Sequence, residues 1–543
     1  MQFLITYLCG NKRITTPTED DKIHVMVEDE ADHKKLIIKA LDKIVVTKVC
    51  VAFDYKFKDS DSVFLNGYQS ATDSREFNLN ESLNDLKQIP FLTAHKYAFK
   101  NFGDYAFYEY GSGVLHSWDV GYVRSDKGQF IGNNIYSWAG LIIEYRPKEN
   151  KIHLVSDINE VKMAKGEERA FIDAVVEDFE DTSEIKYFDK FTPRTTEKLT
   201  SYSTWYNYED KIDEKIITDD VKALSNAFNL FIIEDGYQSK IGDWKYIDLE
   251  KFPNGLKSIV NKIHEKGAKA GIWIAPFIVQ AESRIVKERP WWLKAVNGKP
   301  VKCGANWGGF YALDFYNDEA RKYVQECLNF YKDMGFDCFK LDYLYAVSLP
   351  LYDGKNRSQV AYESYKFLRD ILGDKIIIGA GCNMAPSFGL FDYVKVGPNI
   401  SLEWDDAWIS KKAHRERNST RVAIVNTLYR SIFNGKVFMN DPDIILIKKE
   451  SKLTSEQQES LSMINVLFGS NLAISEDLTT FAPLYRTYDK KMAKLLDKII
   501  SIRDNATNAK FTRKNNKITI TYELEGSPVS MEYDPDNGVL KEV

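Results

Sequence analysis

Apolar and polar residues alternate in short runs through the first 195 residues of the chain. Residues 35–44, 45–57, 140–145 and 151–156 show this two-residue period, and Asn, Asp and Gly separate the runs. Alternation places every second side chain of a strand on one face, so that one face is buried and the other meets solvent. Closely spaced strands of this kind predict an N-terminal β-sandwich over residues 1–195.

A different pattern extends from residue 196 to residue 505, where short apolar segments alternate with helical segments. Helical periodicity is clear over residues 256–266, 318–334 and 358–371. Strands that alternate with helices predict a parallel sheet, and eight of them over about 300 residues predict a closed (β/α)8 TIM barrel. The eight expected strands are residues 202–207, 230–234, 270–276, 339–344, 375–380, 393–397, 436–439 and 471–475.

The last segment, residues 506–543, returns to the two-residue period over 517–523 and 529–533. This pattern predicts a small C-terminal β region. The expected fold class is therefore α/β, with a central TIM barrel between an N-terminal β-sandwich and a small C-terminal β domain.

Charge and composition argue against several kinds of partner. The 543 residues carry a net charge of −6, from 73 Lys and Arg against 79 Asp and Glu, and no basic block marks a nucleic-acid surface. No apolar run approaches the roughly 20 residues of a membrane span. Residues 1–10 are apolar but lack the positive segment of a signal peptide, and we expect them to form a strand. A cytoplasmic protein without nucleic-acid or membrane partners is the expectation.

The positions of cysteine and histidine predict neither a disulfide framework nor a metal site. The six cysteines include no CxxC pair, and the seven histidines include no HxxxH pair. Scattered cysteines in a chain of this length are typical of reduced thiols. We expect no metal and no other cofactor.

Acidic residues follow several expected strands, at the end where a TIM barrel carries its catalytic groups. The second strand ends in Glu234-Asp235, and the fourth reads Phe-Lys-Leu-Asp-Tyr, with Asp342. One acid at such a position often only caps the next helix, but several around one ring indicate a site. Lys340 lies two residues before Asp342 and points to the same side. A lysine beside a carboxylate suits both a nucleophile and a structural ion pair.

Two further residues allow two interpretations from the residues alone. Trp273, in Gly-Ile-Trp-Ile-Ala-Pro, suits the barrel core and also the floor of a sugar pocket. Cys382, just after the fifth strand, is typical of a small buried apolar residue.

A series of motifs in this region is similar to the barrel of glycoside hydrolase family 36, and most to α-galactosidases of thermophilic bacteria and archaea. The motifs occur in the family's order across nearly the whole barrel, which makes the series specific although each motif alone is modest. They include Ile-Glu-Asp-Gly-Tyr-Gln at 233–238, Ile-Gly-Asp-Trp at 241–244, Gly-Ile-Trp-Ile-Ala-Pro-Phe at 271–277, Arg-Pro-Trp-Trp at 289–292, Tyr-Ala-Leu-Asp at 311–314, Phe-Lys-Leu-Asp-Tyr-Leu at 339–344 and Asn-Asp-Pro-Asp at 440–443.

The resemblance implies a retaining α-galactosidase that takes a terminal α-galactoside from an oligosaccharide. By position, Asp342 matches the nucleophile that forms a covalent glycosyl-enzyme. Tyr68 lies in a loop of the N-terminal region, Asn-Gly-Tyr-Gln-Ser, that is similar to the family loop that brings an aromatic ring to the sugar. The other residues that the resemblance places around the sugar are Trp205, Tyr206, Glu234, Asp235, Trp273, Lys340, Cys382 and Lys395.

The chain departs from the family where the second catalytic carboxylate is expected. A retaining mechanism needs two carboxyl groups roughly 5 Å apart. The family has an Asp in a segment of the type Arg-Ile-Gly-Pro-Asp, and this chain has Lys-Val-Gly-Pro-Asn at 395–399. An amide has no proton to donate near neutral pH, so Asn399 cannot act as the general acid. We expect Asn399 to face Asp342 across one pocket.

Several alternatives stay open. Asn399 is either a substitution engineered to trap substrate or a native residue. If it is native, either Glu403, Asp405 or Asp406 supplies the proton, or hydrolysis has been lost. Galactosyl transfer, α-N-acetylgalactosaminidase activity and non-catalytic carbohydrate binding are the alternative functions, and the oligomeric state is open.

Overall fold

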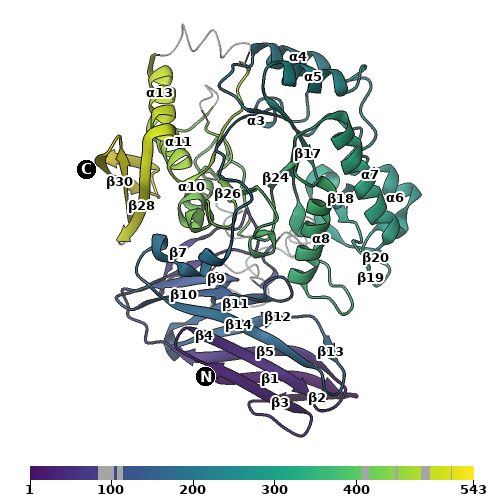
Figure 1. Ribbon diagram of the computed structural model, residues 1–543, viewed down its shortest axis with the longest axis vertical. Helices are drawn as coiled ribbons and strands as arrows, with labels where there is room; N and C mark the ends of the chain where they lie inside the picture. Colours follow the sequence, from purple (N-terminus) through teal and green to yellow (C-terminus); the bar gives the residue numbers. More distant parts are fainter. Residues whose placement is uncertain (84–102, 107–113, 406–414, 447–450, 479–489, 515) are drawn as a thin grey trace.

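The computed structural model folds the chain into three regions that follow one another along the sequence (Figure 1). It describes residues 1–83, 103–106, 114–405, 415–446, 451–478, 490–514 and 516–543. A sandwich of strands forms one end of the molecule, a barrel forms the other, and a small sheet lies beside the barrel.

The N-terminal region consists of two antiparallel sheets. The first has the strand order β2-β1-β5-β12-β11-β8, with β13 paired to β5, and the second has the order β3-β4-β14-β10-β9-β6-β7. Their bounds are β1 (Gln2–Cys9), β2 (Lys12–Thr16), β3 (Ile23–Asp29), β4 (His33–Ala40), β5 (Ile44–Asp54), β6 (Ser62–Leu65), β7 (Arg75–Asn78), β8 (Leu115–Trp118), β9 (Val120–Arg124), β10 (Gly128–Asn133), β11 (Gly140–Arg146), β12 (Lys151–Asp157), β13 (Val161–Met163) and β14 (Glu168–Phe179).

Strand β4 shows why the alternating pattern produces this sandwich. Leu36 and Ile38 are fully buried in the core between the sheets, whereas Lys35 and Lys39 are only half-buried. A shift of the register by one residue would bury the lysines instead, so the pattern fixes the register.

The middle region is a barrel of eight parallel strands, which confirms the expected fold class. Their order is β26-β25-β24-β23-β17-β16-β15-β27, and a parallel bridge between Ile444 and Ala473 lies where the two ends of the sheet approach each other. The bounds are β15 (Leu199–Ser203), β16 (Leu230–Ile233), β17 (Lys269–Ile274), β23 (Cys338–Leu341), β24 (Ile376–Gly379), β25 (Tyr393–Lys395), β26 (Met439–Asp441) and β27 (Asn471–Ile474).

All eight strands differ from the expected bounds by at least one residue, and local turns explain the difference in two of them. β15 ends at Ser203, and Trp205–Tyr208 forms a short helix, α3, instead of the last part of the strand. β26 begins at Met439 and not at residue 436, because the preceding residues turn back on Phe433, which accepts hydrogen bonds from the backbone of Lys436 and Val437. The turn lets Asp441 pair with Lys395 of β25.

Helices on the outside of the barrel connect its strands (Figure 1). In α7 the Asn317 side chain accepts hydrogen bonds from two backbone amides of the first turn, and Gly335 ends the helix with a φ of 98°, a conformation that glycine adopts without strain. The helices include α4 (Glu214–Ala223), α5 (Lys257–Glu265), α6 (Arg284–Glu288), α7 (Asp318–Met334), α8 (Arg357–Leu372), α10 (Thr420–Tyr429), α11 (Ser455–Phe468) and α13 (Lys490–Asn505).

The C-terminal sheet packs against the helices α11 and α13. Its four antiparallel strands follow each other in order and are β28 (Ala506–Lys514), β29 (Lys517–Leu524), β30 (Ser527–Asp534) and β31 (Val539–Glu542).

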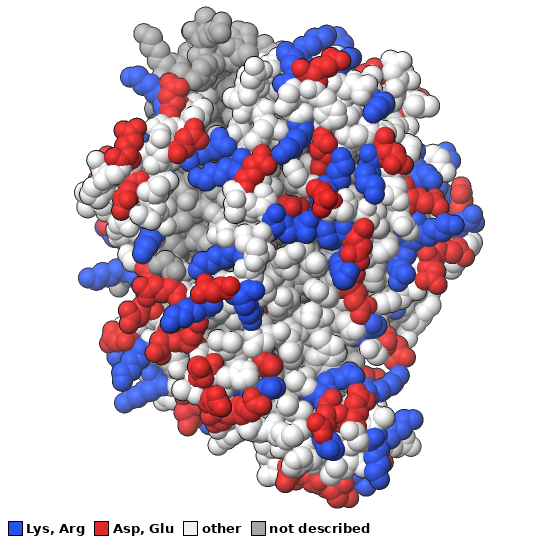
Figure 2. All heavy atoms as spheres, in the orientation of Figure 1, with Lys and Arg blue, Asp and Glu red and all other residues white. Residues whose placement is uncertain are grey.

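The surface carries both signs of charge in close mixture. On the face that Figure 2 shows, Lys and Arg alternate with Asp and Glu over the sandwich and the barrel, without a large area of one sign among the residues it colours. None of the described helices is long and apolar enough to cross a membrane.

Arg430 joins the sandwich to the barrel. Its side chain is fully buried just after α10, and its guanidinium donates to Asn66 Oδ1 at 3.1 Å and to the carbonyls of Gln69 and Ser70, all in a loop of the sandwich. The same guanidinium donates to the carbonyl of Val396 at 2.8 Å, which follows barrel strand β25. One side chain therefore holds a sandwich loop against the end of a barrel strand.

We expect Arg430→Leu to lower the free energy of unfolding by about 3–5 kcal/mol, because several buried carbonyls lose their donor and each unpaired group costs roughly 1–3 kcal/mol. Urea unfolding followed by circular dichroism measures the change. Arg289→Leu, which removes an exposed guanidinium, is the control and should have little effect. An equal, small effect of both substitutions would contradict the role of Arg430 at this junction.

Candidate active site

A cavity of about 830 Å³ opens at the carboxyl ends of β15, β23, β24 and β25. The small three-stranded sheet of β18 (Ile278–Gln280), β21 (Lys302–Gly304) and β22 (Phe310–Ala312) follows β17 in the chain, and the loop between β21 and β22 lines the cavity through Asn306 and Trp307. Five residues that the sequence singled out line the cavity, namely Trp205, Tyr206, Asp342, Lys395 and Asn399.

Asp342 lies directly after β23, and two N–H groups hold its carboxylate. Trp273 Nε1 donates to Oδ2 at 3.2 Å, and the backbone amide of Tyr343 donates to Oδ1 at 2.6 Å. Trp273 is almost fully buried and packs edge-on against Trp244. The tryptophan therefore belongs to the packed barrel, as one interpretation of the sequence expected, and its indole N–H also fixes the carboxylate of Asp342.

The backbone beside Asp342 adopts conformations that few residues accept. Tyr343 has a φ of 54°, and Gly381 in the facing loop has a φ of 55°. A side chain at Gly381 would place its Cβ 3.3 Å from Asp342 Oδ1 and 3.3 Å from the Tyr343 amide nitrogen. Glycine is required there, because a larger residue would press on the carboxylate and be strained itself.

Lys340 pairs with Glu234 and not with Asp342. Its Nζ lies 2.6 Å from Glu234 Oε1, and both side chains are buried. Ser203 Oγ donates to the same glutamate oxygen at 2.8 Å. The structural ion pair between Lys340 and Asp342 that the sequence left open is therefore not formed, and the lysine pairs instead with a glutamate that directly follows β16.

The floor of the barrel mouth balances buried acids against lysines. Burial alone would lower the pKa of Lys340, but the carboxylates of Glu234, Asp443 and Asp441 outweigh it and raise that pKa. Burial raises the pKa of Asp441 in turn, although Lys340 and Lys395 oppose the shift. Lys340 consequently stays charged at neutral pH.

Lys395 lies between Asn399 and Asp443. Its Nζ donates to Asn399 Oδ1 and lies 3.0 Å from Asp443 Oδ2. Asp443 Oδ2 also accepts from the hydroxyl of Tyr206 and, at 3.0 Å, from the backbone amide of Ile400. Asp443 therefore anchors the loop that carries Asn399 as well as the ring of Tyr206.

The sandwich loop reaches the cavity, but not through the residue expected from the resemblance. Gln69, Ser70 and Ala71 line the cavity. Tyr68 itself is not part of the lining. Its almost fully buried ring packs 5.5 Å from Tyr105 and 4.8 Å from Trp118, and its hydroxyl lies 3.4 Å from Ser348 Oγ of the barrel. Tyr68 thus lies against barrel loops that follow β23 and β24, and its contact with a sugar stays a prediction.

Cys382 and Asp235 lie beside the cavity rather than in its lining. Cys382 is fully buried, its Sγ is 3.6 Å from Ser70 Oγ, and burial raises the pKa of its thiol to about 12. Asp235 accepts a hydrogen bond from Gln238 Nε2, and burial raises its pKa. An uncharged thiol against the sandwich loop indicates packing rather than reactivity.

Three residues of the site were not among the candidates taken from the sequence. Asp443 stood in a quoted motif, Asn-Asp-Pro-Asp, without a role. Trp307 lines the cavity with a φ of 51°, and the flanking glycines in Gly-Ala-Asn-Trp-Gly-Gly were a signal for an unusual turn. Glu416 lines the cavity too, and its charged surroundings, Arg-Glu-Arg, gave no sign that it is buried.

The acids proposed near Asn399 lie elsewhere or cannot be placed. Glu403 is exposed and lies 2.5 Å from Lys452. Asp405 accepts from Ser419 Oγ at 2.7 Å. Neither belongs to the described lining of the cavity. Asp406 lies outside the described residues.

The described residues contain no group of three or more His, Cys, Asp or Glu that could hold a metal ion. The two buried lysines of the floor are held by carboxylates. The arrangement suits binding of hydroxyl groups and chemistry at a carboxylate.

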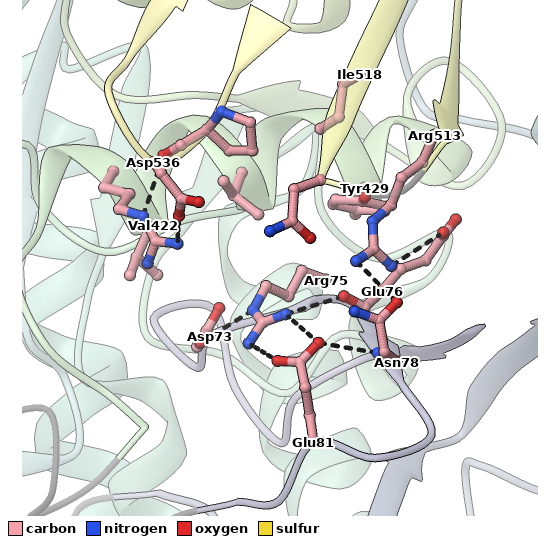
Figure 3. Close-up of a pocket in the computed structure, with 14 residues that line it drawn as sticks. Asp73, Arg75, Glu76, Asn78, Glu81, Val422, Tyr429, Arg513, Ile518 and Asp536 are labelled. Carbon is pink, nitrogen blue, oxygen red and sulfur yellow. Dashed lines mark hydrogen bonds and ion pairs between the residues drawn. The ribbon is translucent and has the colours of Figure 1, made fainter. Parts of the chain in front are cut away.

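A second cavity, of about 280 Å³, lies where the three regions meet (Figure 3). Arg75 of β7 lies 2.8 Å from Glu81, and Arg513 of β28 points toward Glu76, 3.7 Å away. Arg421 of α10 lies 2.9 Å from Asp536 of the C-terminal sheet. These guanidinium groups have carboxylate partners, so this junction joins the C-terminal sheet to the other two regions by paired charges.

Comparison with known proteins gives the context for the first cavity. Residues 195–372 match the family model Melibiase. Alpha-galactosidase Mel36A of Lactobacillus acidophilus is 32% identical over 152 residues, which is 26% of this chain and 19% of that protein. Alpha-xylosidase XylQ of Lactiplantibacillus pentosus is 30% identical over 172 residues, or 30% and 21% of the two chains. The chain thus matches only about a fifth of the length of these curated relatives.

The solved structures cover much more of the chain. TtGalA, an alpha-galactosidase from Thermus thermophilus, superposes with a TM-score of 0.72 and 21% identity over 93% of this chain and 98% of its own. The GH36 alpha-galactosidase AgaA of Geobacillus stearothermophilus has a TM-score of 0.62 and 11% identity over 98% and 81% of the two chains. The fold is that of family 36 α-galactosidases.

The Melibiase match divides the site into two parts. It includes Glu234, Trp273, Lys340 and Asp342, which lie between β15 and α8. It ends at residue 372, before Lys395 and Asn399. The part of the cavity around Asp342 is therefore the part that the family model describes.

We expect Glu234→Gln and Lys340→Met each to lower the free energy of unfolding by about 3–5 kcal/mol, because each leaves one buried charge unpaired. The double variant should cost less than the sum of the two by at least about 1 kcal/mol. Denaturant unfolding of the four proteins gives this coupling energy. Strictly additive effects would mean that the two charges do not stabilise each other.

Proposed function

We propose that the protein is a retaining α-galactosidase that hydrolyses terminal α-galactosides of oligosaccharides through a covalent ester with Asp342. The observation that carries the proposal is the carboxylate of Asp342, held by two N–H donors, in one cavity with position 399. By the resemblance, position 399 matches the second catalytic group. The galactoside complexes named for TtGalA, with p-nitrophenyl α-D-galactopyranoside and with stachyose, support galactose as the sugar.

Asp342 has the setting that a nucleophile needs. Trp273 Nε1 and the Tyr343 amide fix its two oxygens, so little rotational freedom is lost when it reacts. In the first step an Asp342 oxygen attacks the anomeric carbon while the bond to the leaving oxygen breaks. In the second step water attacks the same carbon and releases the carboxylate. Two inversions at one carbon retain the α configuration.

The other residues of the cavity have proposed roles in binding. The rings of Trp205 and Tyr206 offer apolar faces to the C–H side of a sugar. Lys395 of the lining offers a donor to its hydroxyl groups. The buried pair of Lys340 and Glu234 lies outside the described lining and is proposed to complete the binding site. Asp235, Trp273, Cys382 and Tyr68 support this lining from behind, and the named residues require no cofactor.

Position 399 limits the chemistry of this site. Asn399 accepts a hydrogen bond from Lys395, and its amide has no proton to give to a leaving oxygen. A phenol with an acidic hydroxyl leaves without help, whereas a sugar alkoxide needs a proton. Hydrolysis of natural galactosides therefore depends on a proton from another group.

Two rivals have specific support. The amide at position 399 favours a protein that binds carbohydrate without hydrolysing it. The match to alpha-xylosidase XylQ favours xylose as a second sugar to test. The related galactosyl transferase and α-N-acetylgalactosaminidase activities differ in the acceptor and in the substituent at the sugar's second carbon.

The test is an assay of p-nitrophenyl glycosides of α-galactose, α-N-acetylgalactosamine and α-xylose, with the first product followed by proton NMR. A retaining α-galactosidase releases α-galactose before mutarotation. Release of β-galactose would exclude the retaining mechanism. Faster hydrolysis of another glycoside would replace galactose as the proposed sugar. If calorimetry detects galactose binding but no glycoside is hydrolysed, the protein binds carbohydrate without catalysis.

We expect Asp342→Asn to reduce hydrolysis of p-nitrophenyl α-galactoside by about 10⁴-fold or more, because no ester can form. Mass spectrometry of the unsubstituted protein with a slow fluorinated galactoside should find the label on Asp342. Asp353→Asn, which removes an exposed carboxylate paired with Lys162, is the matched control and should keep full activity. Label on any other residue would contradict the assignment.

A further inference from the structure

We propose that Glu416 is the proton donor and acceptor of this site, in place of the carboxylate that position 399 lacks. The inference rests on the proposed galactosidase function and names the group that completes its chemistry.

Glu416 reaches the cavity from a segment of the barrel that pairs with the sandwich loop. It lines the same cavity as Asp342, although only 1% of its surface is exposed. A bridge joins its backbone to Thr72. Oε1 accepts from Thr72 Oγ1 at 2.7 Å and from the Asp104 amide at 3.0 Å. Oε2 has no hydrogen-bond partner among the described residues, so the carboxyl is anchored through one oxygen and can exchange a proton at the other.

The surroundings of Glu416 keep both of its protonation states populated near neutral pH. Burial, together with the neighbouring charge of Asp104, raises the pKa of its carboxyl to about 7, although the hydrogen bonds from Thr72 and the Asp104 amide and the charge of Arg415 oppose the shift. Arg430 and Tyr345 also interact electrostatically with it. A general acid and base works best when its pKa lies near the working pH.

The other candidate groups fit this role less well. An acid at position 399 would contact Lys395, which donates to Asn399 in this structure. The positive charge of the lysine would favour the ionised form of such an acid, which has no proton to donate. Glu403 is paired with Lys452 outside the lining. Glu209 lines the cavity, but its side chain is exposed and its carboxylate accepts no hydrogen bond from the described residues that would fix its direction.

The proposed steps balance protons and bonds. In the first step Asp342 forms a bond to the anomeric carbon, the bond to the leaving oxygen breaks, and that oxygen takes the proton of Glu416, directly or through one water molecule. In the second step the Glu416 carboxylate takes a proton from the attacking water. The bond from the anomeric carbon to Asp342 breaks, and both carboxyl groups return to their starting states.

The experiment compares Glu416→Gln with the unsubstituted protein on two substrates. Glutamine keeps an oxygen that can accept from Thr72 and Asp104, so the fold should be kept, and thermal unfolding checks this. For methyl α-galactoside, kcat/KM should fall by about 10²–10⁴-fold. For 2,4-dinitrophenyl α-galactoside the first step should change little, and the glycosyl-enzyme should accumulate. Azide should then restore turnover and yield α-galactosyl azide, which a purely structural role of Glu416 does not explain.

The pH dependence gives an independent readout. Glu416 must be protonated to donate, so kcat/KM for methyl α-galactoside should be high below about pH 7 and decline as pH rises through the pKa of about 7. Glu416→Gln should remove this alkaline limb. Glu416→Asp keeps a carboxyl on a shorter arm and should retain the limb at a lower rate, which keeps the test valid if the glutamine variant fails to fold.

Three further variants separate the possible outcomes. Asn399→Asp should restore about 10²-fold or more in the Glu416→Gln background, because it supplies a second carboxyl group to the same cavity. Glu326→Gln, an exposed acid paired with Lys245, is the control. A large gain of activity from Asn399→Asp alone would overturn the inference. So would a loss of activity in Glu209→Gln or Glu403→Gln but not in Glu416→Gln; in both cases the galactosidase proposal would stand. An unsubstituted protein that hydrolyses no galactoside and is never labelled at Asp342 would overturn both.

Discussion

The buried guanidinium of Arg430 is the constraint on which the site depends. It donates to the sandwich loop that contributes Gln69, Ser70 and Ala71 to the cavity, and to the carbonyl of Val396. Val396 begins the short segment that leads to Asn399. Because one rigid, planar group holds both, the two walls of the cavity keep a fixed distance that neither domain could set alone.

The charges around Lys340 and Lys395 are paired, whereas those around Glu416 are not balanced in the same way. Lys340 and Lys395, at the ends of two barrel strands, neutralise Glu234 and Asp443, which come from two others. Each pair satisfies charges that burial would otherwise leave unpaired. Glu416 higher up has an acidic neighbour in Asp104 and a basic one in Arg415. The balanced floor favours a fixed geometry, whereas the unequal surroundings of Glu416 favour a change of protonation.

The sequence was sufficient for the order of the elements and for the strand ends that carry acids, because two-residue and helical periods are local properties. It misjudged β15 and β26, where turns decide the bounds. Tyr68 shows a second limit: residues 69–71 of its loop line the cavity, whereas the ring of Tyr68 packs on Tyr105 and Trp118, two residues far away in the chain. The partner of Lys340 and the burial of Glu416 depend on contacts between residues far apart in the chain, which no local period records.

Because residues of two domains line the cavity, its evolution is constrained. A barrel that recombined with a different N-terminal partner would keep Asp342 and lose both the wall at Gln69–Ala71 and the bridge from Thr72 to Glu416. The sandwich and the barrel must therefore be inherited as one unit if this cavity is to keep its present lining. The loop that carries Trp307 begins and ends within the barrel region, so changes there leave the contribution of the sandwich unaltered.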